Sequence, residues 1–557
     1  MTKKFSQLII VIGVVAVASA LAIYFFKTHR RSIELNAGGY KDFNILLVTL
    51  DTVRADHLGT YGYNRVRTPN LDHLGSESFV FEDAIAHVPL TLPSHVSIMT
   101  GRLPIAHGVR DNAGFVLNQN EITLAEALKD QGYTTAAFVS ATVLESRWKL
   151  NQGFDVYDDY FKNVVSADLS NEVERHAADT EKVSSQWLDK NHAKKFFIWV
   201  HFYDAHDPYS PPEPFKSAYS DDPYDGEIAY VDDAVGKLLA KLDTLQLKQR
   251  TIVIVTSDHG EGLGEHREPT HGVFLYNTTQ HVPLIIFLPG AEGKRISGSV
   301  CHIDLAPTIL QLIGAKAQSK MQGKSLIAKI NGNDNQQRSV YSESLYAQLH
   351  YGWSKLESIT TDQYRYIYSP KPELFDRKAD KAESNNLLQE KASIAKVLNS
   401  KLTEMIQQFS SAHLAGPQKI DPETEEKLRA LGYIGTTVNS TEESRKVDPK
   451  DKAEVILQIQ EASGLLGQQK YAQALDKVLP VLQQDSGMID AHYVAGLAYL
   501  QLGKFNDAVT ELRKTLELNP QDTRAMYNLG FAFELMKQPK DAEFWYLKAL
   551  QLNPENT

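Results

Sequence analysis

The chain has 557 residues, more than one ordinary hydrophobic core accommodates, so two or more folded parts are expected. Hydrophobic residues make up 42% and charged residues 23%, as in globular proteins. The formal net charge of −11 provides no basic surface for nucleic acid, which excludes DNA or RNA as the main partner. The single cysteine, Cys301, excludes an internal disulfide and a cysteine-based zinc knuckle.

Residues 1–31 are predicted to form an uncleaved transmembrane anchor. Residues 5–26 carry no charged side chain, and a run of this length is sufficient to cross a bilayer as a helix. A cleaved signal peptide is the alternative, with Ala18-Ser19-Ala20 as the cleavage site. The anchor is favoured because the apolar run continues to Phe26.

Basic residues flank both sides of this run, so the charge rule does not fix its orientation. The working hypothesis is a cytoplasmic N-terminus, with the remainder of the chain outside the cytoplasm, in the periplasm. Residues 32–42 are expected to be a short linker.

Residues 43–410 are predicted to form an α/β domain. The apolar run from Asn44 to Leu50 is typical of a strand buried on both faces, as in a parallel sheet. Alternation of strand and helix patterns favours a sheet with helices on both faces. The further strand patterns lie at 134–139, 196–200, 251–256 and 282–288, and a helical one at 123–128.

Acidic and histidine side chains follow three of these strands. Asp51 ends the first, Asp258-His259 follow the strand at 251–256, and His201 to Asp207 includes two histidines and two acids. Ligand sites in open α/β sheets lie beyond the carboxyl ends of strands, and Asp and His bind divalent cations. The pattern predicts a metal site of Asp51, Asp258 and His259. His206 is a further active-site candidate, whereas His201 fits a packing role equally well.

A candidate nucleophile, Thr91, lies in the stretch Thr91-Leu92-Pro93-Ser94. Proline is suited to the first turn of a helix, where free N–H groups and the helix dipole favour an anionic substrate. The alternative is that Thr91 only caps the helix.

The C-terminal part has a repeat. Residues 411–452 are polar and are predicted to be a linker with a short helical piece. Beyond them Gly496 recurs at Gly530, and Ala508 at Ala542, each 34 residues apart. This period is the tetratricopeptide pattern of paired helices, so residues 453–557 are expected to be all-α and to bind a peptide or protein partner, or another copy of the chain. Packing against the catalytic domain is the alternative role.

Taken together, the strand-end clusters over residues 43–410 resemble the alkaline phosphatase superfamily in its sulfatase-like branch. Thr91-Leu92-Pro93-Ser94-His95 is similar to the nucleophile motif of that family, and Asp258-His259 to its metal pair. The resemblance implies an alkaline-phosphatase-like α/β fold. It also implies that Asn112 contacts the substrate oxyanion and that Asp376 belongs to a small C-terminal subdomain.

Three departures from the sulfatase pattern bear on function. Thr91 stands where sulfatases carry the Cys or Ser that becomes formylglycine, His95 stands in place of an Arg, and Thr52 replaces the second Asp of an Asp-Asp pair. Threonine is not a substrate for that conversion. A Thr nucleophile is instead similar to the phosphoryl-transferring relatives. His271 lies where those transferases have His, and with His206 it is a candidate for a second metal or phosphate site, with Asp204 or Asp207 as the carboxylate.

The sequence thus predicts a membrane-anchored, metal-dependent hydrolase or transferase that cleaves phosphate esters through Thr91, with Asn112, His206 and His271 as further catalytic residues. The expected cofactor is one or two divalent ions: zinc, manganese or calcium. The partners are an anionic ester substrate, the membrane, and a protein bound by the repeats. Two alternatives stay open: a sulfatase that acts without formylglycine, and an inactive scaffold that acts through its repeats.

Overall fold

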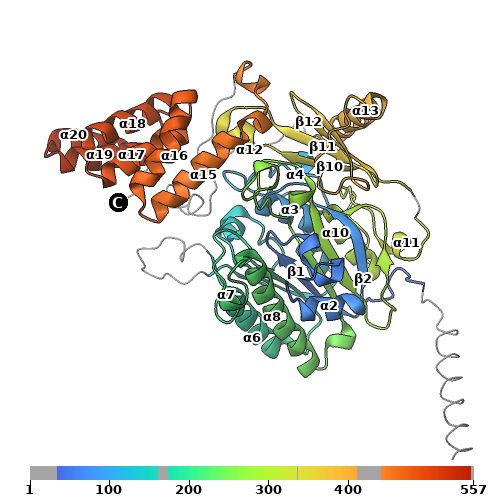
Figure 1. Cartoon of the computed structure of the whole chain (residues 1–557). Coiled ribbons are helices and arrows are strands. Elements are labelled where there is room, and N and C mark those ends of the chain that lie inside the picture. Colours follow the sequence, from blue (N-terminus) through green and yellow to red (C-terminus); the bar gives the residue numbers. More distant parts are fainter. Residues whose placement is uncertain (1–33, 161–173, 335, 411–440, 553–557) are drawn as a thin grey trace, which may run out of the picture.

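The computed structural model describes residues 34–160, 174–334, 336–410 and 441–552. Two parts are visible, an α/β part and a set of helices that extends from one side of it (Figure 1). The predicted anchor at residues 1–31 lies outside the described residues. Within those residues, no helix combines the length and the apolar character needed to cross a bilayer.

A nine-stranded sheet forms the centre of the α/β part, in the order β4-β3-β5-β1-β6-β7-β2-β8, with β9 beside β2. Strand β1 lies between β5 and β6 and is parallel to both. The strands are β1 (Asn44–Leu50), β2 (Phe79–Ile85), β3 (Thr134–Phe138), β4 (Val156–Asp158), β5 (Phe196–Phe202), β6 (Thr251–Ser257), β7 (His281–Phe287), β8 (Arg295–Ile296) and β9 (Val300–Cys301).

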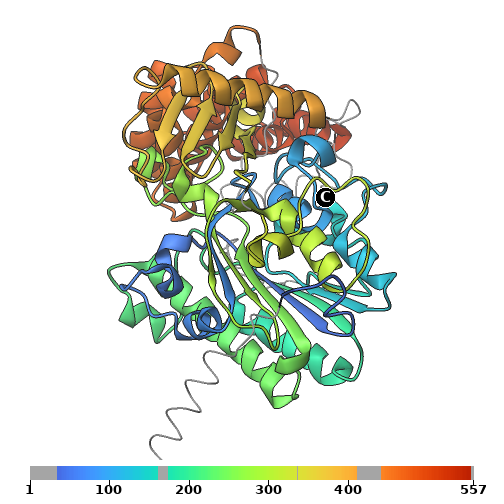
Figure 2. The same ribbon diagram turned by 90° about the vertical axis from the view of Figure 1, so that its right-hand side faces the viewer.

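Helices cover both faces of this sheet, as predicted. Successive side chains of a strand point to opposite faces. Ile45 therefore packs with α3 and α10 on one face, and Leu46 with α6 and α8 on the other. Figure 2 shows the strands between these layers, with α6 and α8 in green below them. The main helices are α2 (Pro69–Ser76), α3 (Thr91–Thr100), α5 (Leu124–Lys129), α6 (Ala177–Asn191), α8 (Pro223–Thr244) and α10 (Leu305–Leu312).

One strand of the central sheet runs opposite to its two neighbours. The pattern at 282–288 does form a strand, β7, but it runs antiparallel to both β6 and β2. Parallel neighbours need a long crossover connection, usually a helix. The segment between β6 and β7 instead carries the Asp258-His259 loop and only short helices, so the chain returns directly and the sheet is mixed.

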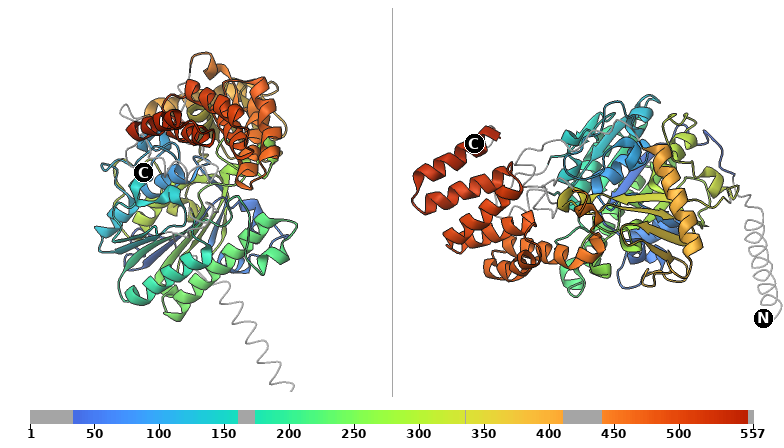
Figure 3. Two further views of the ribbon diagram at one scale, coloured as in Figure 1. Left: turned by 90° about the vertical axis from the view of Figure 1, so that its left-hand side faces the viewer. Right: turned by 90° about the horizontal axis from the view of Figure 1, so that it is seen from above.

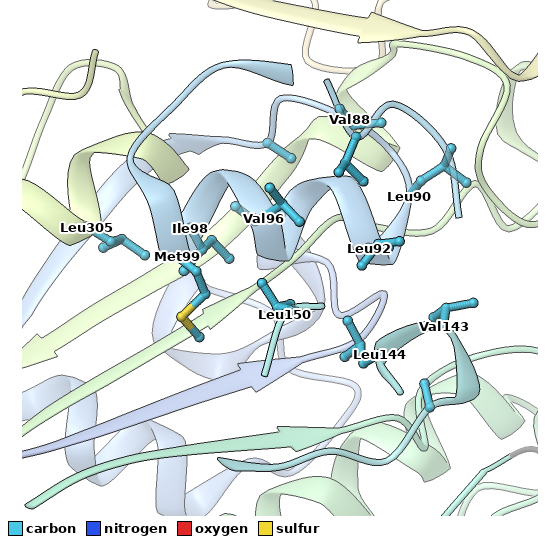
Figure 4. Packing of buried hydrophobic residues seen from close by; sticks show 14 of the residues in the cluster. Val88, Leu90, Leu92, Val96, Ile98, Met99, Val143, Leu144, Leu150 and Leu305 are labelled. Carbon is cyan, nitrogen blue, oxygen red and sulfur yellow. The ribbon is translucent and has the colours of Figure 1, made fainter. Parts of the chain in front are cut away.

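Helix α3 is buried along its whole length. Val96, Ile98 and Met99 lie against the apolar side chains of neighbouring loops and helices, among them Leu144, Leu150 and Leu305 (Figure 4). A helix that is enclosed on all sides has little freedom to move, because protein interiors are close-packed. The helix therefore holds its first residue, Thr91, in a fixed position.

A second, four-stranded antiparallel sheet, in the order β10-β11-β12-β13, follows the central one and is drawn in yellow above it in Figure 2. Asp376 ends its last strand, in the small C-terminal subdomain where the resemblance placed it. The elements are β10 (Val340–Ser344), α12 (Tyr346–Tyr351), β11 (Leu356–Thr360), β12 (Tyr364–Tyr368), β13 (Glu373–Asp376) and α13 (Ala392–Phe409).

The C-terminal helices pack as successive antiparallel pairs, as the 34-residue period predicts. Figure 3 shows them stacked in an arm beside the catalytic part. Gly496 and Gly530 hold equivalent places, since a Cβ there would lie 2.8 Å from Leu512 and 2.7 Å from Tyr546. The helices are α15 (Ala453–Gly467), α16 (Tyr471–Gln484), α17 (Ile489–Gln501), α18 (Phe505–Leu518), α19 (Thr523–Leu535) and α20 (Pro539–Leu552).

The structure describes parts of the two segments predicted as linkers. Residues 34–42 pack on the catalytic part: Leu35 and Tyr40 are buried, and Gly38 N–H donates to the carbonyl of Gln311 (2.9 Å). Residues 441–452 form two short 3-10 helices, η9 (Ser444–Lys446) and η10 (Pro449–Lys452). The remainder of the predicted linker, residues 411–440, lies outside the described residues.

Candidate metal and nucleophile site

The three predicted metal ligands come together at the carboxyl edge of the central sheet. Asp51 follows β1 and Asp258 follows β6, and these strands are parallel neighbours, so their ends meet. One ligand atom each from Asp51, Asp258 and His259 lies within 4.8 Å of the other two. All three side chains are fully buried.

This cluster has open acceptor atoms. Asp51 Oδ1 and Asp258 Oδ2 are buried and have no hydrogen-bond partner among the described residues. His259 Nδ1 lies 3.0 Å from the carbonyl of Gly260 and therefore donates its proton there. The lone pair of His259 Nε2 then faces Asp258 Oδ2 at 3.5 Å and Asp51 Oδ1 at 3.7 Å. Two carboxylate oxygens and an imidazole nitrogen fit a divalent cation.

Thr91 lies directly beside these atoms. Its Oγ1 is 3.4 Å from His259 Nε2, and the whole residue is buried. Helix α3 begins at Thr91, after Leu90, so Thr91 occupies the first helical position and is not the N-cap residue. The capping alternative is therefore wrong, and the hydroxyl lies where the N-terminal N–H groups favour an anion.

Thr52 explains one departure from the sulfatase pattern. Its φ of 56° lies in the left-handed region, which a β-branched residue rarely adopts. In this conformation its N–H donates to Asp258 Oδ1 (3.3 Å) and its hydroxyl donates to the carbonyl of Ala205 (2.6 Å). Thr52 thus orients Asp258, and the strain is local to the site, as is common at functional positions.

His95, at the position of the sulfatase arginine, carries no fixed charge. Its Nδ1 donates to the carbonyl of Thr91 (2.8 Å), and its Nε2 accepts from the hydroxyl of Thr49 (2.9 Å). Trp199 Nε1 donates in turn to that hydroxyl (2.9 Å). Burial lowers the pKa of His95 to about 3, so the ring is neutral at physiological pH. His95 therefore supports helix α3 and supplies no positive charge to a substrate.

His201 has a role that the sequence left open. Its Nδ1 accepts from the N–H of Ser140 (3.3 Å), so its Nε2 donates to Asp51 Oδ2 (3.2 Å). Burial lowers the pKa of His201 to about 4 and raises that of Asp51 to about 7. This hydrogen bond fixes the carboxylate of Asp51, in the way that outer partners orient metal ligands. Only the fold brings the two residues together.

A second set, of His95, His201 and Asp258, also brings one ligand atom from each residue within 4.8 Å of the other two. Three of its four imidazole nitrogens are engaged with Thr91, Thr49 and Asp51, and the fourth accepts from Ser140. Because these nitrogens are occupied, the set of Asp51, Asp258 and His259 is the better cation site.

Asn112 lies against the start of helix α3. Its Oδ1 accepts from the N–H of Leu92 (2.8 Å), which is the residue after Thr91. Its Nδ2 is buried and has no hydrogen-bond partner among the described residues. The side chain therefore has donors available for an oxyanion near Thr91, which is the role that the resemblance implies.

His206 and His271 lie next to this site, with ring centres 4.8 Å apart and His271 4.4 Å from His259. Burial lowers the pKa of both, to about 4 for His271, so both rings are neutral. Among the described residues, no set of three ligand atoms that includes either histidine is compact enough to hold a metal. The geometry thus favours one cation.

The carboxylate that contacts His271 in the structure is not one of the two suggested from the sequence. Asp204 pairs with His176 (3.2 Å). The carboxylate beside His271 is Glu261, whose Oε1 lies 3.1 Å from His271 Nδ1. Glu261 is fully buried, and burial raises its pKa well above the ordinary value. It lies three residues after Asp258 in the glycine-rich loop and is not among the site residues predicted from the sequence.

Comparison with known protein families agrees with this architecture. Residues 43–315 match the family "Sulfatase", and residues 264–409 match "N-sulphoglucosamine sulphohydrolase, C-terminal". Residues 496–537 match "TPR repeat" and residues 523–556 "Tetratricopeptide repeat". The chain therefore carries a catalytic domain of the sulfatase family, with an alkaline-phosphatase-like fold, followed by tetratricopeptide repeats. Both resemblances predicted from the sequence are confirmed.

Curated relatives are sulfatases. An ulvan-active sulfatase of Formosa agariphila is 27% identical over 434 residues, which is 66% of this chain and 82% of the relative. An arylsulfatase of Clostridium perfringens is 23% identical over 62% of this chain and 90% of its own length. The catalytic part is thus that of a sulfatase-family hydrolase.

Solved structures share the fold at low identity. One, in complex with its substrate D-glucosamine-2-N,6-O-disulfate, is 22% identical with a TM-score of 0.58, and the match covers 67% of this chain and 99% of that one. A phosphonate monoester hydrolase of Agrobacterium radiobacter is 20% identical with a TM-score of 0.58, over 66% and 96% of the two chains. The relatives favour the sulfatase alternative over the phosphate esters preferred from the sequence.

Proposed function

We propose that the chain hydrolyses sulfuric esters of an anionic substrate, such as a sulfated sugar, with Thr91 as nucleophile and one divalent cation as cofactor. The observation that carries the proposal is the buried Thr91 hydroxyl beside the open acceptor atoms of Asp51, Asp258 and His259. The names of the relatives support the sulfate ester, and a sulfated glucosamine bound to a structural neighbour supports a sugar.

The mechanism follows from these positions. A cation held by Asp51, Asp258 and His259 would act as a Lewis acid, lowering the pKa of the Thr91 hydroxyl and neutralising charge on the ester oxygens. Thr91 Oγ1 attacks sulfur, the bond from sulfur to the ester oxygen breaks, and the proton lost from Thr91 is balanced by the one gained by the leaving alcohol. Water then hydrolyses the sulfo-threonine ester, which releases sulfate and restores the hydroxyl.

The surrounding residues hold the substrate during these steps. Asn112 Nδ2 donates to a non-bridging oxygen, and helix α3 directs its N-terminal N–H groups at the same charge. His206 and His271, whose rings lie next to His259, are proposed to face the leaving group. His201 and Thr52 orient the two carboxylates.

A second candidate, cleavage or transfer of phosphate esters, is favoured by Thr91 itself. A hydroxyl nucleophile that lacks the formylglycine precursor is similar to the phosphoryl-transferring relatives, and one structural neighbour acts on phosphonate monoesters. Phosphoryl transfer relies mainly on positioning and charge stabilisation, which this site offers equally.

The test is side-by-side turnover of an aryl sulfate, a phosphate monoester and a phosphodiester by the purified protein with added zinc, manganese or calcium. We expect the highest kcat/KM on the sulfate and a loss of at least about 1,000-fold in Thr91→Ala, because removal of a nucleophile abolishes the covalent route. Thr91→Ser keeps the hydroxyl and is the matched control. Preference for a phosphate ester would establish the second candidate. Undiminished activity of Thr91→Ala would contradict both.

The other parts complete the proposal. The repeats are proposed to bind a protein or peptide partner, and the N-terminal segment to anchor the enzyme with its catalytic part in the periplasm. Absence of both turnover and bound metal in the purified protein would instead favour the scaffold alternative.

A further inference from the structure

Asn112 owes its position to the residue before it. Asp111 Oδ1 accepts from the backbone N–H of Asn112 (2.8 Å), while Asn112 Oδ1 accepts from Leu92 at the start of helix α3. Both side chains are buried. The side-chain amide of Asn112 is therefore held by helix α3, and the backbone that carries it is held by the carboxylate of Asp111.

The second oxygen of that carboxylate is held from far along the chain. His350 Nε2 lies 2.7 Å from Asp111 Oδ2, across 239 residues of sequence, and each side chain is no more than 2% exposed. Since a carboxylate oxygen accepts, Nε2 donates. A buried carboxylate that loses such a donor must move or take up a proton.

His350 lies on α12, and the chain beyond α12 is fastened to the segment that leads into the repeats. Ser354 N–H donates to the carbonyl of Val447 (3.0 Å), and the Ser444 hydroxyl donates to the carbonyl of Gly352 (2.8 Å). The Trp353 ring stacks on Tyr351, with ring centres 4.6 Å apart. Lys452, at the start of the repeat domain, places its Nζ 5.8 Å from the centre of the Trp353 ring.

We propose that His350 is a positioning residue of the active site: through Asp111 it sets the place of the Asn112 amide, and the segment 441–452 holds α12 so that it does so. The proposal rests on the function proposed above, in which Asn112 binds the charged oxygen of the ester. It follows that the connection to the repeats is part of the catalytic architecture.

The experiment compares His350→Leu, which removes the donor, with His350→Gln, whose amide N–H reaches about the place of Nε2. We expect His350→Leu to lower kcat/KM by about 10- to 100-fold, because a displacement of about 1 Å can cost about 100-fold. His350→Gln restores most of the activity. In an Asn112→Ala background, His350→Leu has little further effect, because residues that act through one contact are not additive.

The matched control is His492→Leu in helix α17. His492 Nδ1 also pairs with a carboxylate, Glu511 (2.6 Å), and the residue is buried, but the pair lies in the repeats. Its loss is expected to lower the unfolding temperature without a change in kcat/KM. Equal activity of His350→Leu and His492→Leu, or full additivity of His350→Leu with Asn112→Ala, would overturn the proposal while leaving the proposed function intact.

Binding of inorganic sulfate distinguishes a failure of the proposed function from a failure of the positioning role of His350. If the wild-type protein turns over no ester, the proposed function fails, and sulfate affinity measured by calorimetry with the metal present decides the inference. Equal weakening of sulfate binding in His350→Leu and Asn112→Ala supports the positioning role. Wild-type affinity in His350→Leu contradicts it.

Discussion

The catalytic centre and the repeat domain bury side chains of opposite kinds. At the carboxyl edge of the central sheet, Asp51, Thr91 and Asp258 are fully buried, and two carboxylate oxygens have no hydrogen-bond partner among the described residues. In the repeats most fully buried side chains are small or apolar, such as Ala508 and Leu512, and the buried carboxylate of Asp522 is paired with Arg524.

Burial of side chains therefore has a different consequence for stability in each of the two regions. In the repeats, burial removes apolar surface from water and stabilises the helices against one another. At the catalytic centre, burial keeps polar atoms away from water and leaves them unpaired, which costs stability and prepares them for a ligand. Substitutions in the two regions should therefore change different quantities.

Among the tests of this difference, the largest effect is expected from removal of the metal. A chelator should lower turnover by at least about 100-fold while the protein stays folded, because a Lewis acid contributes several kcal/mol of charge stabilisation. Added zinc, manganese or calcium should restore the activity and raise the unfolding temperature, since the ion binds the folded state. Activity and metal content are measured together.

Two variants show whether the loss of activity is caused by loss of the ion from the predicted metal site. Asp258→Asn should fail to regain activity when metal is added. Asp56→Asn should regain it, because that carboxylate pairs with Arg54 and is half exposed. Full activity of the chelated wild-type protein would contradict a catalytic metal.

A smaller effect, on stability alone, is expected in the repeats. Leu512→Ala leaves a cavity against Gly496 and should lower the unfolding free energy of the repeat domain by about 2–5 kcal/mol. Denaturant unfolding measures the loss, and kcat/KM should stay within about twofold of the wild-type value. Thr510→Ala, an exposed position on the same helix, is the control. A large fall in kcat/KM of the folded Leu512→Ala variant would show that the two regions are not separable in this way.

The smallest effect is expected from a buried carboxyl outside the catalytic cluster. Burial raises the pKa of Glu227 from 4.5 to about 9, with Asp204 adding to the shift. Between these values the unfolded chain releases a proton that the folded protein keeps, so stability falls as pH rises through that window. Glu227→Gln keeps the acceptor for the Ser210 N–H, which Glu227 Oε1 provides at 2.8 Å.

The unfolding temperature of Glu227→Gln relative to wild type should therefore increase steadily from pH 5 to pH 9. Glu442→Gln, at an exposed carboxyl, should show no such trend. A constant difference across the range would mean that Glu227 is ionised in the folded protein.

The sequence by itself determined five strands of the central sheet, the repeats and the main candidates of the site. Apolar runs that end in Asp51 and Asp258 specify two buried parallel strands, whose carboxyl ends must meet when the strands are neighbours. The 34-residue spacing of Gly496 and Gly530 specified the helix pairs, because only a residue without Cβ fits their close approach. These are local or periodic features, which a sequence displays directly.

Only the tertiary structure decided how these residues are supported and charged. The contacts of His201 with Asp51 and of His350 with Asp111 span 150 and 239 residues, and no spacing rule relates such positions. The direction of β7 depended on the absence of a crossover helix, and the neutrality of His95 on complete burial. Each follows from packing between distant segments, since burial, hydrogen-bond partners and local dielectric are properties of the folded chain.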